Sequence, residues 1–231
     1  MRKLAWSLCL LALALCISSL PAMAQTTFFT DLGTGSNVYN CCSGWTISGT
    51  GTVGESFTAA NEFMAGATGS VSQIDIGIGD VTGTNSFFAA LYTANGSAPG
   101  TLIDQWNGLS SSTTFGQCCG LVSITGITGV SLTSGTDYFL IIGPTNLSAT
   151  TWEAWNWNSQ GVNGLDLYAT SGCSNGSGNG CSWVSNGTGN PLGAFDVIGS
   201  TGQTVPEPSS LLLLGTGLVG AFGSIRRKLM K

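Results

Sequence analysis

The sequence predicts an all-β fold: a single β-sandwich or jelly-roll domain at residues 25–204, between a signal-peptide helix and a C-terminal hydrophobic helix. Three observations predict this fold class. Apolar and polar residues alternate over short stretches, glycine- and asparagine-rich turns separate these stretches, and the domain shows no sustained helical period. Many short strands joined by such turns are typical of sandwiches. A length of about 180 residues suits one domain of this kind.

The clearest strand signal lies at residues 71–78, where Ile74, Ile76 and Ile78 share one face. This period of two predicts a half-buried strand. Turn sequences at 95–100 and 134–135 separate other apolar stretches. Further strands are predicted at residues 87–93, 102–106, 121–124, 137–142 and 194–198.

Residues 1–24 have the three parts of a secretory signal peptide. Arg2 and Lys3 form a basic start, an apolar run follows at 4–17, and Ala24 ends a small-residue cleavage sequence. The apolar run is shorter than the ~20 residues that a membrane span needs. We therefore expect export by the Sec machinery, cleavage by signal peptidase between Ala24 and Gln25, and a mature chain that begins at Gln25.

The chain ends in an apolar stretch without charge at 211–225 and a basic end at 226–231, which together with residues 205–210 form a tail. As a helix with ~1.5 Å rise per residue, the apolar stretch is about 22 Å long, against a hydrocarbon core of ~30 Å, so it is a marginal membrane span. Basic residues beside a span favour the cytoplasmic side. Arg226, Arg227 and Lys228 are therefore predicted to act as a basic stop on the cytoplasmic side of the membrane, with the domain on the other side.

The segment before the apolar stretch reads Val-Pro-Glu-Pro at 205–208. Prolines remove backbone donors and bias the residues before them towards extended geometry, so this segment suits the grip of a processing peptidase. Pro206, Glu207 and Pro208, followed by the leucine-rich stretch and the arginine cluster, resemble the PEP-CTERM sorting signal. The resemblance implies recognition by the membrane enzyme exosortase, in a Gram-negative bacterium that makes extracellular polysaccharide. It also implies a location at the cell surface or in the extracellular matrix after transient anchoring in the inner membrane.

The domain itself shows a looser resemblance. The runs at 90–100 and 130–140 are similar to segments of exported β-sandwich domains of bacterial surface proteins, sometimes named choice-anchor domains. This resemblance implies the same sandwich architecture that the alternation predicts.

The predicted domain holds ten of the chain's eleven acidic residues, since only Glu207 lies outside it, and it has no lysine, arginine or histidine. Without histidine, general acid–base catalysis lacks its commonest group, and a serine or cysteine nucleophile lacks a basic partner. We predict no catalytic residue, no cofactor and no nucleic-acid partner, because basic residues supply most affinity for phosphate. The remaining enzymatic alternative is a glycosidase, which would use a pair of carboxylates. Its candidate acids are Asp75, Asp80, Asp104, Glu153 and Asp166.

Eight cysteines occur in the chain, and six of them remain once Cys9 and Cys16 leave with the signal peptide. An even number in an exported domain favours disulfides. Cys173 and Cys181 flank a glycine-rich loop and are predicted to close it. The adjacent pairs at 41–42 and 118–119 are predicted to bridge each other. No metal site is predicted, because zinc ligands are spaced by two to four residues and no calcium-loop motif occurs. The disulfide candidates are Cys41, Cys42, Cys118, Cys119, Cys173 and Cys181.

The tryptophan-rich stretch at 151–158 places Trp155 and Trp157 on one face if it forms a strand. Aromatic faces beside amides suit stacking on sugar rings, so Trp152, Trp155 and Trp157 are candidate glycan-binding residues. Large aromatic side chains more commonly fill the core of a sandwich, and we favour this interpretation.

These observations predict an exported, non-enzymatic surface or matrix protein, associated with extracellular polysaccharide and processed at its tail by exosortase. The alternatives are a carbohydrate-binding module that uses the tryptophan strand and, behind it, the carboxylate glycosidase.

Overall fold

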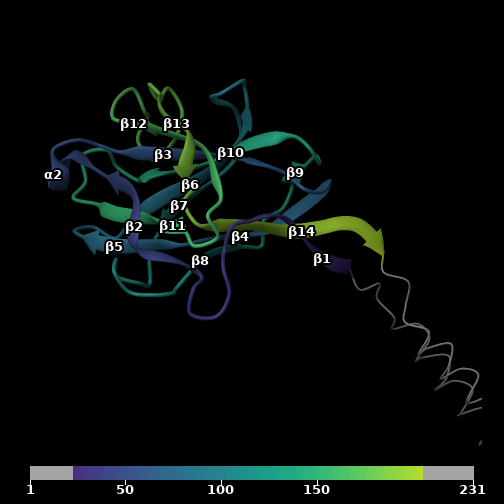
Figure 1. The fold of residues 1–231 in the computed structure, drawn as a ribbon. Coiled ribbons are helices and arrows are strands. Elements are labelled where there is room, and N and C mark those ends of the chain that lie inside the picture. The colour runs from purple at the N-terminus through teal and green to yellow at the C-terminus, as the bar shows by residue number, and fades with distance from the viewer. Residues whose placement is uncertain (1–22, 205–231) are drawn as a thin grey trace, which may run out of the picture. The chain divides into compact units, whose positions relative to one another are not determined.

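The structure is a computed structural model that describes residues 23–204, within which Gln25–Thr201 form one compact unit. Almost all of its regular structure is β, with a single short helix, α2 (Thr50–Val53), among the described residues. The predicted all-β fold class is therefore confirmed (Figure 1). The two predicted terminal helices lie outside the described residues.

One layer is a six-stranded antiparallel sheet with the order β13-β12-β3-β10-β6-β7. Its strands are β3 (Thr58–Met64), β6 (Phe87–Ala94), β7 (Pro99–Leu109), β10 (Asp137–Pro144), β12 (Asn163–Ala169) and β13 (Val184–Pro191).

The other layer consists of two smaller sheets. A five-stranded sheet has the order β1-β14-β4-β8, with β9 also paired to β4, and a three-stranded sheet has the order β2-β11-β5. Their strands are β1 (Met23–Thr30), β2 (Tyr39–Ser48), β4 (Gly69–Ile76), β5 (Ile78–Thr82), β8 (Val122–Thr125), β9 (Ser131–Leu132), β11 (Trp152–Asn158) and β14 (Phe195–Thr204).

The main core lies between these two layers. From the six-stranded sheet, β10 contributes Leu140 and Ile142, and the smaller sheets contribute Ile74, Ile47 and Trp155, all fully buried in one cluster. The strands β10 and β6 are apolar on both faces, which is why their sequences are continuous hydrophobic runs rather than alternating ones. Residues from all three sheets thus form one continuous hydrophobic core.

A second apolar cluster lies on the opposite face of the six-stranded sheet. It includes Phe139, Ile141 and Tyr92, and the loop at 170–183 covers part of it. Within this loop, Gly178 approaches Ile141 so closely that a Cβ atom would lie 2.9 Å from its Cδ1, and Tyr92 donates its hydroxyl hydrogen bond to Asn179 Oδ1 at 3.0 Å. The predicted disulfide between Cys173 and Cys181 closes this loop and is confirmed.

Removal of this disulfide should lower the free energy of unfolding. A closed loop of about nine residues corresponds to roughly 2.5 kcal/mol of chain entropy in the unfolded state. We expect the Cys173→Ser/Cys181→Ser variant to lose about this much in a denaturant titration. A matched Cys41→Ser/Cys42→Ser variant should unfold with the wild-type midpoint, since these two cysteines are free thiols. An unchanged midpoint in the first variant would contradict the expectation.

Most predicted strands occur, with one informative exception. The stretch predicted as a single strand at 71–78 is divided at Gly77 into β4 and β5, which belong to different sheets. Gly77 donates to Ala194 O at 2.9 Å and accepts from Asn156 N at 2.8 Å, and a Cβ atom there would lie 2.8 Å from the Tyr39 ring. The glycine therefore lets the chain change sheets while Ile74, Ile76 and Ile78 all stay fully buried, as the alternation predicts.

Candidate functional site

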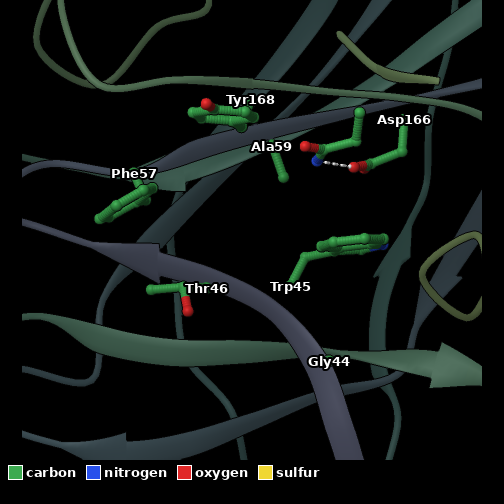
Figure 2. A pocket seen from close by; sticks show the side chains of 8 residues that line it. Gly44, Trp45, Thr46, Phe57, Ala59, Asp166 and Tyr168 are labelled. Atoms are coloured by element: carbon green, nitrogen blue, oxygen red, sulfur yellow. Dashed lines mark hydrogen bonds between the residues drawn. The ribbon is translucent and has the colours of Figure 1, made fainter. Parts of the chain in front are cut away.

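A pocket of about 350 Å³ opens where the three-stranded sheet meets the β12 end of the six-stranded sheet. Strand β2 forms one wall, and strands β3, β12 and β13 form the other. Figure 2 shows the Trp45 indole across the hollow from Tyr168 and Ala59, with Phe57 and Asp166 towards its two ends. The lining residues are Gly44, Trp45, Thr46, Phe57, Ala59, Asp166, Tyr168 and Asn186.

Aromatic rings from both layers form the walls. Trp45 is fixed by a hydrogen bond from its Nε1 to Pro191 O at 3.0 Å and by packing against Trp157, whose ring centroid lies 5.4 Å away. On the other wall, the rings of Phe57 and Tyr168 have centroids 6.4 Å apart. All of these rings are half-buried, so each has some surface towards solvent.

The polar end of the pocket is built around Asp166. Asn61 Nδ2 donates to Asp166 Oδ1 at 2.6 Å, and Asn186 Nδ2 donates to its Oδ2. Asn61 is itself oriented, because its Oδ1 accepts a hydrogen bond from Gly193 N at 2.6 Å. Burial raises the pKa of Asp166 to about 6, although the hydrogen bonds from Asn186 and Asn61 favour the charged form. The carboxylate is therefore held rigidly and is mostly ionised at neutral pH.

Strand pairing explains this arrangement. In the register of β12 with β3, Asp166 lies opposite Asn61 and Tyr168 lies opposite Ala59. The alternating residues of β12, Leu165 and Leu167, point to the other face and join the second apolar cluster. Ala59, which has a small side chain, belongs to the edge of the main core and lines the pocket together with Tyr168.

The three tryptophans of β11 differ in burial, and none of them is among the residues that line the pocket. Trp155 is fully buried, and its Nε1 donates to Ala194 O at 3.2 Å, so the core interpretation is confirmed for this residue and its candidacy as a glycan-binding residue is wrong. Trp157 shares that face, is half-buried and packs on Trp45. Trp152 is half-buried and is not among the residues that line the pocket.

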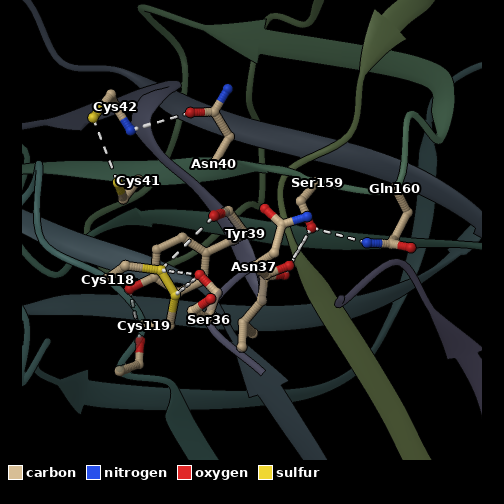
Figure 3. Close-up of a disulfide and its surroundings, with 12 residues drawn as sticks. Ser36, Asn37, Tyr39, Asn40, Cys41, Cys42, Cys118, Cys119, Ser159 and Gln160 are labelled. Atoms are coloured by element: carbon tan, nitrogen blue, oxygen red, sulfur yellow. Dashed lines mark hydrogen bonds between the residues drawn. A yellow bond between two sulfur atoms is a disulfide. The ribbon is translucent and has the colours of Figure 1, made fainter. Parts of the chain in front are cut away.

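The predicted bridges between the two adjacent cysteine pairs are not formed. Cys118 and Cys119 are bonded to each other, whereas Cys41 and Cys42 are free thiols with their Sγ atoms 3.4 Å apart (Figure 3). The pairs are near each other, because Gly116 N donates to Cys41 O at 2.9 Å. The sulfur atoms of Cys118 and Cys119 instead lie 3.6 and 3.5 Å from Ser36 O. Proximity was thus predictable from the pattern, but the pairing was not.

The candidate acids of a glycosidase do not converge on the pocket, where Asp166 is the one carboxylate among the lining residues. Glu153 on β11 lies directly opposite Asp80 on β5, in the three-stranded sheet. Asp75 on β4 lies opposite Asp196 on β14, in the five-stranded sheet. Asp104, the fifth candidate, lies on β7 at the edge of the six-stranded sheet.

Two carboxyl groups are buried although at least one oxygen of each has no hydrogen-bond partner among the described residues. Glu153 is fully buried, and neither of its carboxylate oxygens has a hydrogen-bond partner among the residues that the structure describes. Burial, and then the neighbouring charge of Asp80, raise the pKa of Glu153 to about 8. Burial likewise raises the pKa of Asp31 to about 8, although Phe195 N donates to its Oδ1 at 2.7 Å. Both groups are therefore largely protonated at neutral pH.

Sequence reasoning missed the main pocket residues. Trp45 follows the cysteine pair of β2 and was not assigned to any strand, and Tyr168 was not singled out. A signal for β12 was present in the alternation of Leu165, Asp166, Leu167 and Tyr168, which is the pattern of a strand with one apolar and one mixed face.

The remaining predicted sites fall largely outside the described residues. The sorting motif Pro206, Glu207 and Pro208 and the basic stop lie beyond residue 204, so the structure says nothing of them. The expected cleavage between Ala24 and Gln25 falls within β1, and such cleavage retains the strand from Gln25 onwards. In the described part, no helix is long and apolar enough to cross a bilayer, and no three His, Cys, Asp or Glu side chains converge to hold a metal ion.

Comparison with known proteins identifies the tail. Residues 204–228 match the family model of the PEP-CTERM protein-sorting motif. The match includes the three residues of the predicted motif, the apolar stretch and the basic stop. No curated protein matches the chain. The match covers the tail alone, so the likeness of the β-domain to choice-anchor domains stays a prediction.

Proposed function

The chain is an exported protein with a PEP-CTERM sorting signal that exosortase processes, and from this premise we propose that its β-domain is a non-enzymatic surface or matrix module associated with extracellular polysaccharide. The observation that carries the proposal is the order of the parts: a disulfide-bonded sandwich directly followed by the sorting signal. The host in this proposal is a Gram-negative bacterium, and the tail anchors the chain in the inner membrane until it is processed.

The chemistry of the domain supports a role without catalysis. The pocket has one carboxylate among its lining residues, whereas glycoside hydrolysis uses two that flank the bond. The domain has no histidine or lysine that could activate a nucleophile. Aromatic walls beside a fixed carboxylate instead favour binding of a sugar, which is a specific form of polysaccharide association.

Processing of the tail is expected to remove its basic end. The intact mass of protein from the envelope of the native host should correspond to a chain that lacks Arg226, Arg227 and Lys228. The reason is that the Pro-Glu-Pro segment presents extended backbone, which a peptidase can hold. A Glu207→Ala variant is the matched control and should accumulate with its tail intact. Recovery of wild-type protein that still ends in Lys231 as the main species would contradict processing.

Association with polysaccharide has a direct test. Extracellular polysaccharide from the host is isolated and washed with high salt, and the protein is quantified in the washed polysaccharide and in the supernatant. We expect the processed protein to stay with the polysaccharide and to be released when the glycan is digested. Protein found entirely in the supernatant would refute the association but would leave export and sorting untouched.

A further inference from the structure

We infer that the pocket between β2 and β12 binds an uncharged sugar unit of a polysaccharide, with Trp45 and Tyr168 facing its ring and Asp166 accepting hydrogen bonds from its hydroxyls. This inference rests on the proposed function and deepens it, because it names the site and the chemical class of the ligand. It differs from the hypothesis of the tryptophan strand, since Trp155 is in the core and Trp152 is not at the pocket.

The size and walls of the pocket fit a ring of this kind. A volume of about 350 Å³ is at the lower end of the roughly 300–1,000 Å³ typical of small-molecule sites. Trp45 comes from one sheet and Tyr168 from the other, and Figure 2 shows their rings on opposite sides of the hollow. The faces of aromatic rings carry partial negative charge, which attracts the C–H hydrogens on the apolar face of a pyranose.

Asp166 supplies the polar half of the recognition. A carboxylate has about four acceptor positions, and Asn61 and Asn186 occupy two of them in the structure. The side chain is almost fully buried but lines the pocket, so a sugar bound there would bring its hydroxyls to the remaining positions, which can accept charge-assisted hydrogen bonds. Because the two amides hold the carboxylate in place before any ligand arrives, little conformational entropy is lost on binding.

The negative charge of the domain favours uncharged sugars over anionic ones. The chain has no basic residue between Leu4 and Ile225, whereas ten acidic residues lie in the domain. A uronic acid, a phosphate or a nucleotide would meet the Asp166 carboxylate with no cation nearby, so electrostatic repulsion disfavours anionic ligands. A neutral hexose or pentose unit avoids this penalty and still offers the hydroxyl donors that Asp166 requires.

The test uses the full-length chain, produced with its own signal and tail and purified in detergent. Neutral oligosaccharides of glucose, galactose, mannose and xylose are titrated against it, with oligogalacturonate as the anionic probe. Binding is followed by tryptophan fluorescence, which Trp45 should report, and by calorimetry. We expect at least one neutral oligosaccharide to bind with a fluorescence change, and oligogalacturonate to bind more weakly than this oligosaccharide or not at all.

Two pocket variants and one control locate the site. Tyr168→Ala removes a half-buried wall residue and should raise the Kd for the neutral oligosaccharide at least about tenfold, with an unchanged circular dichroism spectrum. Asp166→Asn should weaken binding to a similar extent. If Asp166→Asn does not fold, the result with Tyr168→Ala is sufficient to test the pocket assignment. Trp152→Ala is the matched control, because Trp152 is a half-buried aromatic outside the pocket, and it should bind as the wild type does.

The outcomes separate this inference from the function on which it rests. Absence of binding to every neutral probe, stronger binding of oligogalacturonate, or unchanged binding by Tyr168→Ala would each overturn the pocket assignment. If the protein nevertheless stays with the polysaccharide of its host, the proposed function survives and the contact lies elsewhere. If the oligosaccharides bind in the pocket but the protein leaves the polysaccharide, the association fails and the pocket stands.

Discussion

Replacing Trp155 with alanine is expected to lower the free energy of unfolding by about 3 to 5 kcal/mol. The side chain is fully buried, its ring centroid lies 5.7 Å from that of Phe195, and its Nε1 donates to Ala194 O. The substitution leaves a large cavity and removes one of the two hydrogen bonds that Ala194 O accepts, since Gly77 N still donates to this oxygen. Since domains are typically stable by only ~5 to 15 kcal/mol, such a loss would remove a large part of the total.

A denaturant titration of Trp155→Ala against the wild type measures this effect. Trp152→Ala is the appropriate comparison, because it removes the same side chain from the same strand at a half-buried position and should cost less. Wild-type stability of Trp155→Ala would mean that the ring does not fill the core as the structure shows.

Stability is expected to fall as pH rises from about 4 to about 8. Burial is the main cause that raises the pKa of Asp31 and Glu153 to about 8 and that of Asp196 to about 7. In the unfolded chain these carboxyl groups have their ordinary pKa near 4. Between these values the folded state keeps protons that the unfolded state releases, so the stability present below pH ~4 is progressively lost as pH approaches 8.

Glu153 should account for a large share of this dependence. Its carboxyl faces Asp80 across the strands and Ile47 on β2, and the domain has no basic residue that could pair with it. A rise from 4.5 to about 8 corresponds to at most roughly 5 kcal/mol, at ~1.4 kcal/mol per pKa unit. Glu153→Gln removes the ionisation while keeping the shape of the side chain.

Melting temperatures at pH 4.5 and pH 8.5 provide the measurement. The wild type should melt at a clearly higher temperature in acid, and Glu153→Gln should narrow the difference chiefly by stabilising the protein at the higher pH. Glu55→Gln, at an exposed position, should keep the wild-type difference. A wild type that is more stable at pH 8.5 would show that these carboxyls are paired or solvated in the folded protein.

Local sequence patterns predicted much of the fold. The strands at 87–93 and 137–142, which correspond to β6 and β10, were found because they are continuous apolar runs. Such runs can be recognised without knowing which strands they pair with. The Cys173–Cys181 bridge was found because both residues flank one short loop, which limits the choice of partner. The pairing of Cys118 with Cys119 was missed, because the prediction joined each of them to the distant cysteine pair at 41–42.

By itself, the sequence determined export, the PEP-CTERM tail, the all-β class and a domain without cations, because each of these depends on composition or on residues close together in the chain. Only the tertiary structure decided that Trp155 is core while Trp45 and Tyr168 face a pocket, and that Glu153 lies opposite Asp80. These facts depend on strand order and register, which join segments far apart in the chain. The physical reason is that alternation determines which residues share a face, whereas pairing between distant strands determines what that face meets.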